Sequence, residues 1–475
     1  MNNFTIAAIA TPPGRGGIGV IKISGSKALP IAASIFQRAH SNDNPRKHLP
    51  QTRLSDTKSF FKSHAFYYGY IKDPDNGKKI DEVLLTFMRA PRTYTREDVV
   101  EIQAHSGSIG LRAIMELVLR QGARLAEPGE FTKRAFLNGR LDLTQAEAVI
   151  DVINAKTDTA LHIATSQLDG KMKFGIEGLR NRLLEILTEI EAGIDFPEDV
   201  AEIADPNNIT GILQHHILQS LDGLIKQCDS AIILRDGLRL SVIGRPNVGK
   251  SSLLNRLIQK ERAIVTSIPG TTRDLIEETF SINSIPIIIT DMAGLHKTDD
   301  PIEVIGINKA HESIQNSDLI LFMVDSSQPL TPADRQIYEK YRKRDLILVI
   351  NKIDLLNNGA GFDLPDSWQS VPAARISALH DIGIDGLKET IESLAWNDIA
   401  YDQETLIIPN MRHKIALEKS RDAVSGAILG ISQGRPLELI AIDIQESIHR
   451  LGEILGINVR EDIMDQIFSR FCIGK

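Results

Sequence analysis

The chain has 475 residues, of which 42% are hydrophobic and 24% charged, and this composition is typical of soluble globular proteins. The length predicts about three domains. Two cysteines, Cys228 and Cys472, are too few for a disulfide framework and favour a reducing compartment. No apolar stretch approaches the ~20 residues that span a bilayer, and Met1 to Gly17 lacks the basic start of a secretory signal. We therefore expect a cytoplasmic protein without membrane contact.

The net charge of -8 is an average over two unlike parts of the chain. Residues 1–140 contain 21 Lys and Arg against 12 Asp and Glu, whereas the remaining residues contain 33 against 50. The whole-chain charge argues against nucleic acid as a ligand. The basic first segment alone could still bind an anion.

The first 140 residues have the pattern of an α+β domain. Short apolar runs predict strands, and a periodic segment predicts one helix; the strands are 4–10, 18–23, 65–71 and 82–88, and the helix is 109–122. The polar residues 41–62 are expected to form a loop. An aromatic cluster is formed by Phe60, Phe61, Phe66, Tyr67, Tyr68 and Tyr70. It could stack nucleic-acid bases, or it could simply belong to a half-buried strand.

Helical periodicity without proline runs from Thr144 to about residue 193, and Thr144 with Glu147 fits a capping box. A further helix is predicted at about 206–234. From Leu238 to about residue 396, strands and helices alternate, with buried parallel strands predicted at 240–243, 285–290, 319–324 and 346–350. After Pro409 the pattern is helical to the end.

The predicted architecture is therefore multidomain. It comprises an α+β N-terminal domain at 1–140, a helical bundle domain in two parts at 141–236 and 397–475, and an α/β domain at 237–396 inserted between these two parts.

A phosphate-binding motif lies between the first strand and the first helix of the α/β domain. Gly244-Arg-Pro-Asn-Val-Gly249-Lys250-Ser251 has the form G-x-x-x-x-G-K-[ST] in a strand–loop–helix setting. The glycines let backbone N–H groups surround phosphate oxygens, and the helix N-terminus adds its dipole. Lys250 would reach the β- and γ-phosphates, and the Ser251 hydroxyl would bind Mg²⁺. The motif predicts a loop that binds the phosphates of a nucleoside triphosphate together with Mg²⁺.

Three further motifs follow in the order found in Ras-like P-loop GTPases. Asp291-Met-Ala-Gly294 follows the strand 285–290, where its carboxylate could reach the Mg²⁺ shell. Asn351-Lys352-Ile353-Asp354 follows the strand 346–350. The Asp354 carboxylate suits the two donors of guanine at N1 and N2, whereas the acceptor at N1 of adenine would leave both groups unpaired. Ser377-Ala378-Leu379 is placed to support the base. Together these motifs predict GTP binding.

Two loops of the α/β domain bear on hydrolysis. Gly270-Thr-Thr-Arg-Asp274 is in the position of switch I, and Thr272 would be the second hydroxyl on Mg²⁺. Leu295 stands where Ras-type enzymes have a glutamine that positions water. Another polarising group is then required, and Asp299, Asp300 and Glu303 are the nearest acidic candidates. Each could equally be a solvated loop charge.

These residues resemble the TRAFAC-class GTPases, and flanking motifs are similar to one family in particular. They are Ala10-Thr-Pro-Pro-Gly-Arg-Gly-Gly-Ile-Gly19, Tyr94-Thr-Arg-Glu-Asp-Val-Val-Glu101, Pro128-Gly-Glu-Phe-Thr-Lys-Arg-Ala-Phe-Leu-Asn138 and the final Cys472-Ile-Gly-Lys475. The family is that of the tRNA-modification GTPases MnmE, also called TrmE. The resemblance extends from about residue 4 to the last residue.

The resemblance implies a homodimer joined through N-terminal domains that bind a 5-formyl- or methylene-tetrahydrofolate. It implies a partner, MnmG, which carries FAD and uses NADH, in a heterotetramer-type complex. Together such proteins install an aminomethyl or carboxymethylaminomethyl group at C5 of the wobble uridine of tRNA, and hydrolysis of GTP requires K⁺. Transferred by motif, Lys22, Glu101, Arg140 and Lys475 would contact the folate, Glu303 would orient the attacking water, and Cys472 is a candidate catalytic thiol.

The same transfer places K⁺ on Asn247, Thr266, Ile268 and Thr271, and Mg²⁺ on Ser251 and Thr272. A cation beside the phosphates can offset charge that an arginine finger otherwise neutralises. The expected nucleotide-site residues are Asn247, Val248, Gly249, Lys250, Ser251, Ser252, Thr266, Ser267, Ile268, Pro269, Gly270, Thr271, Thr272, Asp291, Met292, Ala293, Gly294, Asn351, Lys352, Ile353, Asp354, Ser377, Ala378 and Leu379.

Three alternatives stay open. Cys472 could be a nucleophile, or it could join the packing face that Ile463, Ile467, Phe468 and Phe471 suggest. The whole protein could be a ribosome-assembly GTPase switch without RNA-modifying chemistry, although only helices and the Cys-Ile-Gly-Lys tail follow the GTPase domain. It could also be a stand-alone folate-binding regulator that its GTPase domain gates.

Overall fold

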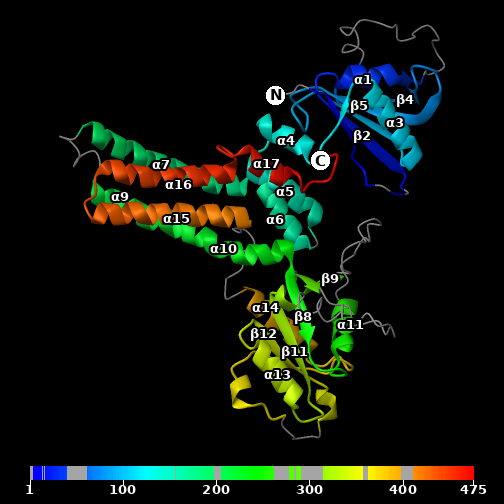
Figure 1. Cartoon of the computed structure of the whole chain (residues 1–475). Coiled ribbons are helices and arrows are strands. Elements are labelled where there is room, and N and C mark those ends of the chain that lie inside the picture. The colour runs from blue at the N-terminus through cyan, green and yellow to red at the C-terminus, as the bar shows by residue number, and fades with distance from the viewer. Residues whose placement is uncertain are drawn as a thin grey trace. The chain divides into compact units, whose positions relative to one another are not determined.

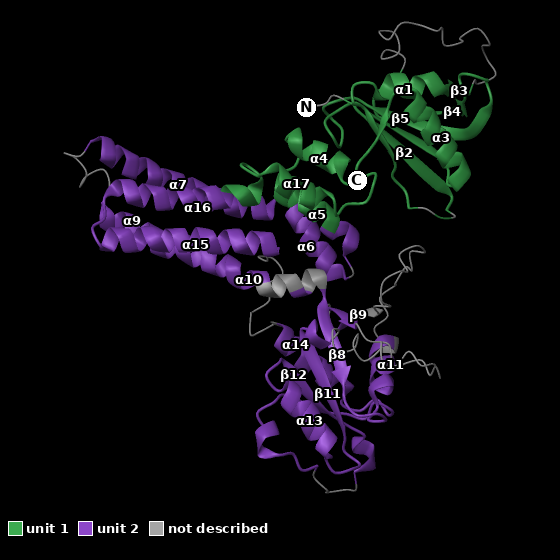
Figure 2. Ribbon diagram, in the orientation of Figure 1, with its two compact units in different colours: residues 1–150, 452–475 green, residues 151–451 purple. Residues whose placement is uncertain are grey.

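A computed structural model describes most of the chain and divides it into two compact units, 1–150 with 452–475 and 151–451 (Figure 2). The described residues are 4–12, 14, 16–39, 61–155, 157–196, 205–260, 278–282, 285–289, 314–356, 362–396 and 410–475. The expected fold class, an α+β N-terminal part, helices and an inserted P-loop α/β domain, is confirmed.

The first unit is built on a seven-stranded sheet (Figure 1). Its order is β3-β4-β5-β6-β2-β1-β7, and all neighbours are antiparallel except β1 and β7. The bounds are β1 Ile6–Ile9, β2 Ile18–Ser24, β3 Phe36–Arg38, β4 Ala65–Lys72, β5 Lys79–Met88, β6 Val99–His105 and β7 Arg124–Leu125. The strands β3, β6 and β7 were not predicted; β3 and β7 have only three and two residues and lack an apolar run that would mark them, whereas β6 has seven residues.

One face of this sheet is covered by two helices, α1 at Ala28–Ile35 and α3 at Ser108–Arg120 (Figure 1). Ile21, Ile23, Leu85 and Ile102 from the strands share one buried cluster with residues of both helices. Because neighbouring residues of a strand point to opposite faces, Lys22 and Glu101 lie on the face that these helices leave uncovered.

The aromatic cluster is explained by the same alternation. On β4, Tyr67 is 6% exposed and contacts Phe61, whereas Phe66 is 62% exposed and Tyr68 is 48% exposed. The described members therefore belong to a half-buried strand, whereas base stacking by the exposed Phe66 and Tyr68 stays a prediction; Phe60 lies outside the described residues.

The end of the chain returns to the first unit. Helix α17, Glu461–Phe468, places Phe468 and Phe471 in a cluster with Leu143 and Ala146. The final residues run beside α4, Glu130–Leu137, where the N–H of Phe131 donates to the carbonyl of Lys475 over 3.2 Å. Gly474 has a φ of 94°, and a Cβ there would lie 2.8 Å from the Cα of Ala10. This close approach requires glycine.

The helical segment after residue 140 differs from its prediction. Three helices replace one long run: α5 at Leu143–Asn154, α6 at Asp158–Leu168 and α7 at Lys171–Asp195. The expected capping box at Thr144 and Glu147 is wrong. Asp142 caps α5 instead, because its carboxylate accepts from the N–H of Gln145 over 3.0 Å while the Gln145 amide oxygen accepts from the N–H of Asp142 over 3.1 Å. Asp142-x-x-Gln145 is the same reciprocal motif two residues earlier.

The helices of the second unit come from both sides of the α/β domain (Figure 1). They include α9 at Pro206–Ile212, a π-helical segment at Leu213–Leu218, α10 at Gln219–Asp236 and α15 at Met411–Ser432. Helix α16 spans Leu437–Leu455 and is joined to α15 by the buried hydroxyls of Ser420 and Ser447, 2.7 Å apart.

The α/β domain has a six-stranded sheet in the order β13-β12-β11-β8-β10-β9, parallel except for β9. Its strands are β8 Leu238–Ile243, β9 Glu278–Ile282, β10 Ile285–Ile289, β11 Leu319–Asp325, β12 Leu346–Asn351 and β13 Ala373–Arg375. Among its described residues, the domain also contains the helices α11 at Lys250–Lys260, α13 at Pro332–Tyr341 and α14 at Ile384–Trp396. Every residue of β10, β11 and β12 is buried, which explains their continuous apolar sequences.

Candidate functional site

The phosphate-binding loop occupies the turn from β8 to α11. Gly244 has a φ of 149° and Gly249 a φ of 108°, so both adopt conformations that side chains disfavour. A Cβ on Gly249 would lie 2.1 Å from Nδ2 of Asn351. Asn247 is also left-handed, with a φ of 64°. The glycines of the motif are therefore required by the loop's path and by the close approach of Asn351.

Lys250 begins α11 and lies across the loop. Its Nζ donates to the carbonyls of Gly244 and Arg245, each over 2.8 Å. The ammonium is thus placed at the N-terminus of a helix, where backbone N–H groups and the helix dipole both favour an anion. Ser251 and Ser252 follow in the first turn and line the same cavity.

Asn351 connects the phosphate side of the cavity to its opposite end. Its side chain is buried, and its Nδ2 donates to the carbonyl of Val248 over 2.8 Å. Its Oδ1 accepts from the N–H of Ala378 over 3.0 Å. The residue therefore joins the P-loop, the end of β12 and the loop after β13. This structural role accompanies the nucleotide contact that the motif predicts.

Lys352 pairs with a carboxylate that sequence reasoning missed. Its Nζ lies 2.6 Å from Oδ2 of Asp325, at the end of β11. Burial opposes ionisation of Asp325, but hydrogen bonds from Lys352 and Ser327 outweigh it and lower the pKa of this carboxyl. Asp325 follows an apolar strand without a recognisable motif, so only the parallel pairing of β11 and β12 reveals the contact.

Asp354 lies beside the loop that follows β13. Its Oδ2 is 3.6 Å from Nε2 of His380, and its side chain is 19% exposed. Leu355 and Leu379 next to it are 59% and 70% exposed. A carboxylate that lines one cavity together with two exposed apolar side chains suits a flat heterocycle that presents two N–H donors.

These residues enclose one cavity of about 660 Å³. It is lined by Pro246, Asn247, Gly249, Lys250, Ser251, Ser252, Asn351, Lys352, Asp354, Leu355, Ser377, Ala378 and Leu379. Its volume is in the range of small-molecule sites. Pro246 and Leu355 were not predicted, although each is adjacent in sequence to a predicted residue. Val248 is a buried residue of the phosphate-binding loop, and Ile353 lies in the same 3-10 turn as Asp354; these two predicted residues do not line the cavity.

Several predicted residues lie outside the described part of the chain. They are Thr266, Ser267, Ile268, Pro269, Gly270, Thr271, Thr272, Asp291, Met292, Ala293, Gly294 and Glu303. Their roles stay predictions.

A second group of predicted residues meets on the first unit. Lys22 on β2 and Glu101 on β6 are directly paired in register, and Nζ of Lys22 lies 4.0 Å from Oε1 of Glu101. Burial lowers the pKa of Lys22, Glu101 opposes this shift, and the positive charge of Lys475 adds to it. Residues from three distant parts of the sequence therefore act on one another electrostatically.

Arg140 lies on the turn after α4, and its observed contacts are with Tyr94 rather than with Lys22, Glu101 or Lys475. Its Nη1 donates to the carbonyl of Tyr94 over 3.1 Å, and its guanidinium lies 4.6 Å from the centre of the Tyr94 ring. The Tyr94 hydroxyl is 2.9 Å from Oγ1 of Thr132. Burial raises the pKa of Tyr94. Cys472 is an exposed free thiol, which argues against the alternative that its side chain joins the packing face of Phe468 and Phe471; its candidate catalytic role stays a prediction.

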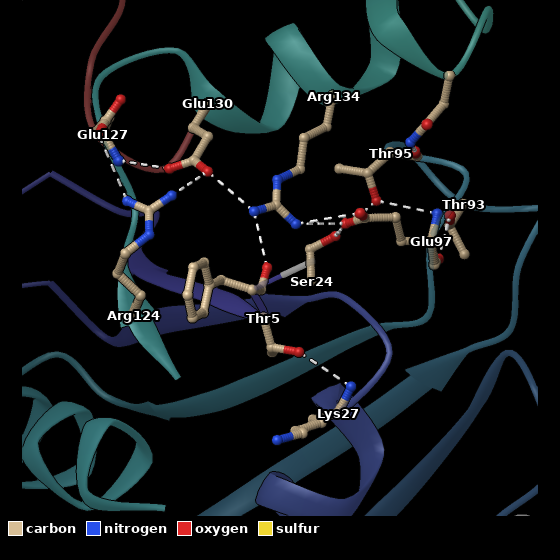
Figure 3. A network of polar contacts seen from close by, with 12 residues as sticks. Thr5, Ser24, Lys27, Thr93, Thr95, Glu97, Arg124, Glu127, Glu130 and Arg134 are labelled. Carbon is tan, nitrogen blue, oxygen red and sulfur yellow. Dashed lines mark hydrogen bonds and ion pairs between the residues drawn. The ribbon is translucent and has the colours of Figure 1, made fainter. Parts of the chain in front are cut away.

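An ion-pair network fixes α4 to the sheet (Figure 3). The Arg134 guanidinium contacts Glu97 over 3.0 Å and Glu130 over 2.9 Å, and donates to the carbonyl of Phe4 over 2.9 Å. Glu130 is also 2.5 Å from Arg124. The network holds the loop that carries Tyr94 against the helix that precedes Arg140. Glu97, Glu130 and Arg134 lie within the family motifs Tyr94–Glu101 and Pro128–Asn138, but no individual role was predicted for them.

A metal centre and a membrane-spanning helix would each indicate a further function. Among the described residues, no group of three or more His, Cys, Asp or Glu side chains is arranged to hold a metal ion. Within the same residues, none of the helices combines the length and apolar character needed to cross a bilayer.

The sheet order, the P-loop at the end of β8 and the carboxylate after β12 define a P-loop GTPase. Two family models match the chain: the GTP-binding protein TrmE N-terminus over residues 5–140 and the MnmE helical domain over residues 143–472. The chain belongs to the MnmE family of tRNA modification GTPases.

Full-length relatives have the same family name. The tRNA modification GTPase MnmE of Alkaliphilus oremlandii is 43% identical over 99% of both chains, and that of Moorella thermoacetica is 44% identical over 100% of both. Among solved structures, Aquifex aeolicus Era bound to GDP.AlF4- is 27% identical, with 39% of this chain and 66% of that chain covered and a TM-score of 0.25.

Proposed function

We propose that the protein hydrolyses GTP in the 660 Å³ cavity and thereby supports C5 modification of the wobble uridine of tRNA in the cytoplasm. The observation that carries the proposal is the placement of Lys250 and Asp354 in one cavity, where Asn351 joins the phosphate-binding loop at Val248 to the loop after β13 at Ala378. A cation for phosphates and a carboxylate for guanine are then held in one rigid frame. The names of the full-length relatives support the tRNA substrate.

The described residues divide the binding of GTP between them. Gly249 and its neighbours present backbone N–H groups to the β-phosphate, and Lys250 reaches the β- and γ-phosphates. Ser251 supplies a hydroxyl for Mg²⁺, whose charge would offset that of the phosphates. Asp354 accepts from N1–H and the 2-amino group of guanine, and Ser377, Ala378 and Leu379 close the end of the cavity where the base lies.

Hydrolysis in this proposal depends on K⁺, which would supply positive charge beside the transferred phosphate. Asn247 supports the assignment, because it lines the cavity next to Lys250. Thr266, Ile268 and Thr271 would complete the set of ligands, Thr272 would join Ser251 on Mg²⁺, and Glu303 would hold the attacking water.

The N-terminal site is proposed to bind a 5-formyl- or methylene-tetrahydrofolate. Lys22, Arg140 and Lys475 offer positive charge to glutamyl carboxylates, and Glu101 offers an acceptor to pterin donors. The pKa of Lys22 is lowered mainly by burial and to a smaller extent by the charge of Lys475, and a bound carboxylate would favour the charged form of this amine. A homodimer through this unit, with MnmG and tRNA as partners, completes the proposal, with Cys472 as a candidate thiol near the one-carbon unit.

The deciding experiment is mass spectrometry of tRNA nucleosides from cells that lack this protein. We expect loss of the C5 modification at the wobble uridine and its recovery with the wild-type chain. An unchanged nucleoside profile would contradict the proposal and favour an assembly GTPase.

The cation assignment has a separate test. Phosphate release by the full-length chain should be many times faster in K⁺ than in Na⁺, and Asn247→Ala should abolish this difference. Equal rates of the wild-type chain in the two salts would refute the K⁺ assignment and leave GTP binding intact.

A further inference from the structure

An arginine outside every motif contacts the loop that closes the nucleotide cavity. Arg256 lies on α11, six residues after Lys250. Its Nη2 donates to the carbonyl of Leu379 over 2.9 Å, and its Nε donates to the carbonyl of Ala378 over 3.4 Å. The planar guanidinium thus spans two consecutive carbonyls of the loop Ser377–Asp381, which a lysine ammonium cannot match.

The same loop is held from its other side by Asn351. Oδ1 of Asn351 accepts from the N–H of Ala378 over 3.0 Å, whereas Arg256 binds the carbonyl of that residue. Ala378 is therefore fixed through both of its peptide groups. Of the two contacts, only that of Asn351 belongs to a sequence motif.

The loop Ser377–Asp381 needs such support because few backbone hydrogen bonds are formed within it. Ser377 and Ile382 form an isolated pair of backbone hydrogen bonds of 2.9 and 3.2 Å. Asp381 between them has a φ of 61°, a conformation unfavourable for a residue with a side chain. Its Oδ1 lies 3.9 Å from Nε of Arg256. Leu379 at the tip is 70% exposed.

We propose that Arg256 is a positioning residue that ties the base-binding loop to the phosphate-binding helix. Helix α11 binds phosphates at its N-terminus and, one and a half turns later, holds the loop against the base. The cavity is then preorganised at both ends by a single element. This inference rests on the nucleotide site of the proposed function and adds to it a residue that determines how well the base is held.

The experiment uses the full-length chain and the fluorescent nucleotide mant-GDP. Arg256→Met keeps most of the side-chain length and removes its donors, and Arg256→Lys keeps the charge. Arg335→Met is the matched control, because Arg335 is an exposed arginine on α13 that does not line the cavity. Dissociation rates of mant-GDP are measured by stopped flow, and dissociation constants of GDP and of inorganic triphosphate by competition.

We expect Arg256→Met to release mant-GDP about tenfold faster, which corresponds to the loss of one to two hydrogen bonds. Arg256→Lys should show an intermediate rate, and Arg335→Met the wild-type rate. The affinity for inorganic triphosphate, which has no base, should stay within about twofold of wild type in all variants. This base-dependent loss separates positioning of the loop from general destabilisation, which would weaken both ligands equally.

Three outcomes would overturn the inference: a mant-GDP dissociation rate unchanged in Arg256→Met, equal weakening of GDP and triphosphate, or the same effect in Arg335→Met. If Arg256→Met does not fold, Arg256→Lys alone decides by the same criteria. A wild-type chain that binds no guanine nucleotide would instead refute the proposed function, so the two failures are distinguishable.

Discussion

The nucleotide cavity and the N-terminal site are assembled in opposite ways. The described residues of the cavity follow the ends of β8, β12 and β13, and each predicted group is a short continuous segment. The N-terminal site takes single residues from β2, β6 and the last position of the chain. The cavity depends on local backbone geometry and the N-terminal site on long-range packing, so substitutions should affect the two differently.

The largest expected effect is that of Lys250→Ala on GTP hydrolysis. Because Lys250 is proposed to contact the transferred phosphate, its removal should lower kcat by about a thousandfold. Phosphate release in K⁺ measures the loss, and thermal unfolding should be nearly unchanged. Binding of 5-formyl-tetrahydrofolate, measured by calorimetry, should also be unaffected; a parallel loss of folate binding would break the proposed independence of the two regions.

The next effect concerns stability in the first unit. Arg134→Met leaves Glu97 and the buried Glu130 without their shared cation, which should lower the free energy of unfolding by about 3 kcal/mol. Urea unfolding monitored by circular dichroism measures it. Arg112→Met is the control, because the Arg112 side chain is 74% exposed and its pair with Glu116 spans 3.7 Å. Equal stabilities of the two variants would show that the network contributes nothing.

A smaller effect tests how the cavity recognises guanine. Asp354→Asn replaces an acceptor by an amide that can also donate, so GTP affinity should fall by about ten- to a hundredfold. Xanthosine triphosphate has a carbonyl in place of the 2-amino group and should bind the variant better than it binds the wild type. Competition against mant-GDP measures both affinities. Retention of full GTP affinity would remove Asp354 from base recognition.

The smallest effect is a dependence of stability on pH, which should be confined to the first unit. Nδ1 of His105 lies 2.7 Å from Oδ1 of Asp81. The hydrogen bond to Asp81 raises the pKa of His105; for Asp81, burial opposes ionisation, but hydrogen bonds from His105 outweigh it and lower the pKa. The stability that the charged form of His105 contributes to the folded state is thus fully present below about pH 6.5 and is lost as pH rises through its raised pKa. The stability that the charged form of Asp81 contributes is lost as pH falls through its lowered pKa.

An NMR titration of the imidazole should place the midpoint of His105 above about 6.5, and Asp81→Asn should bring it down. A midpoint unchanged by Asp81→Asn would contradict the assignment. Neither His105 nor Asp81 lines the nucleotide cavity, so Asp81→Asn should change the pH dependence of the first unit and leave GTP hydrolysis unchanged. Lys250→Ala should have the opposite pattern of effects.

The sequence by itself was enough to predict the nucleotide-binding motifs, the buried strands β10, β11 and β12, and the helical character of the segments around them. These features depend on neighbouring residues: a glycine loop between a strand and a helix, a continuous apolar run, or a carboxylate directly after a strand. The family was identified for the same reason, since its motifs are continuous in the chain.

Only the tertiary structure decided which distant residues meet. Asp325 and Lys352 are neighbours because β11 and β12 are paired, and Arg256 reaches Ala378 and Leu379 because α11 packs beside the loop after β13. The return of Lys475 to the first unit likewise rests on a close approach at Gly474. Packing free energy sums over many such contacts between segments far apart in the chain, and no local pattern records its result.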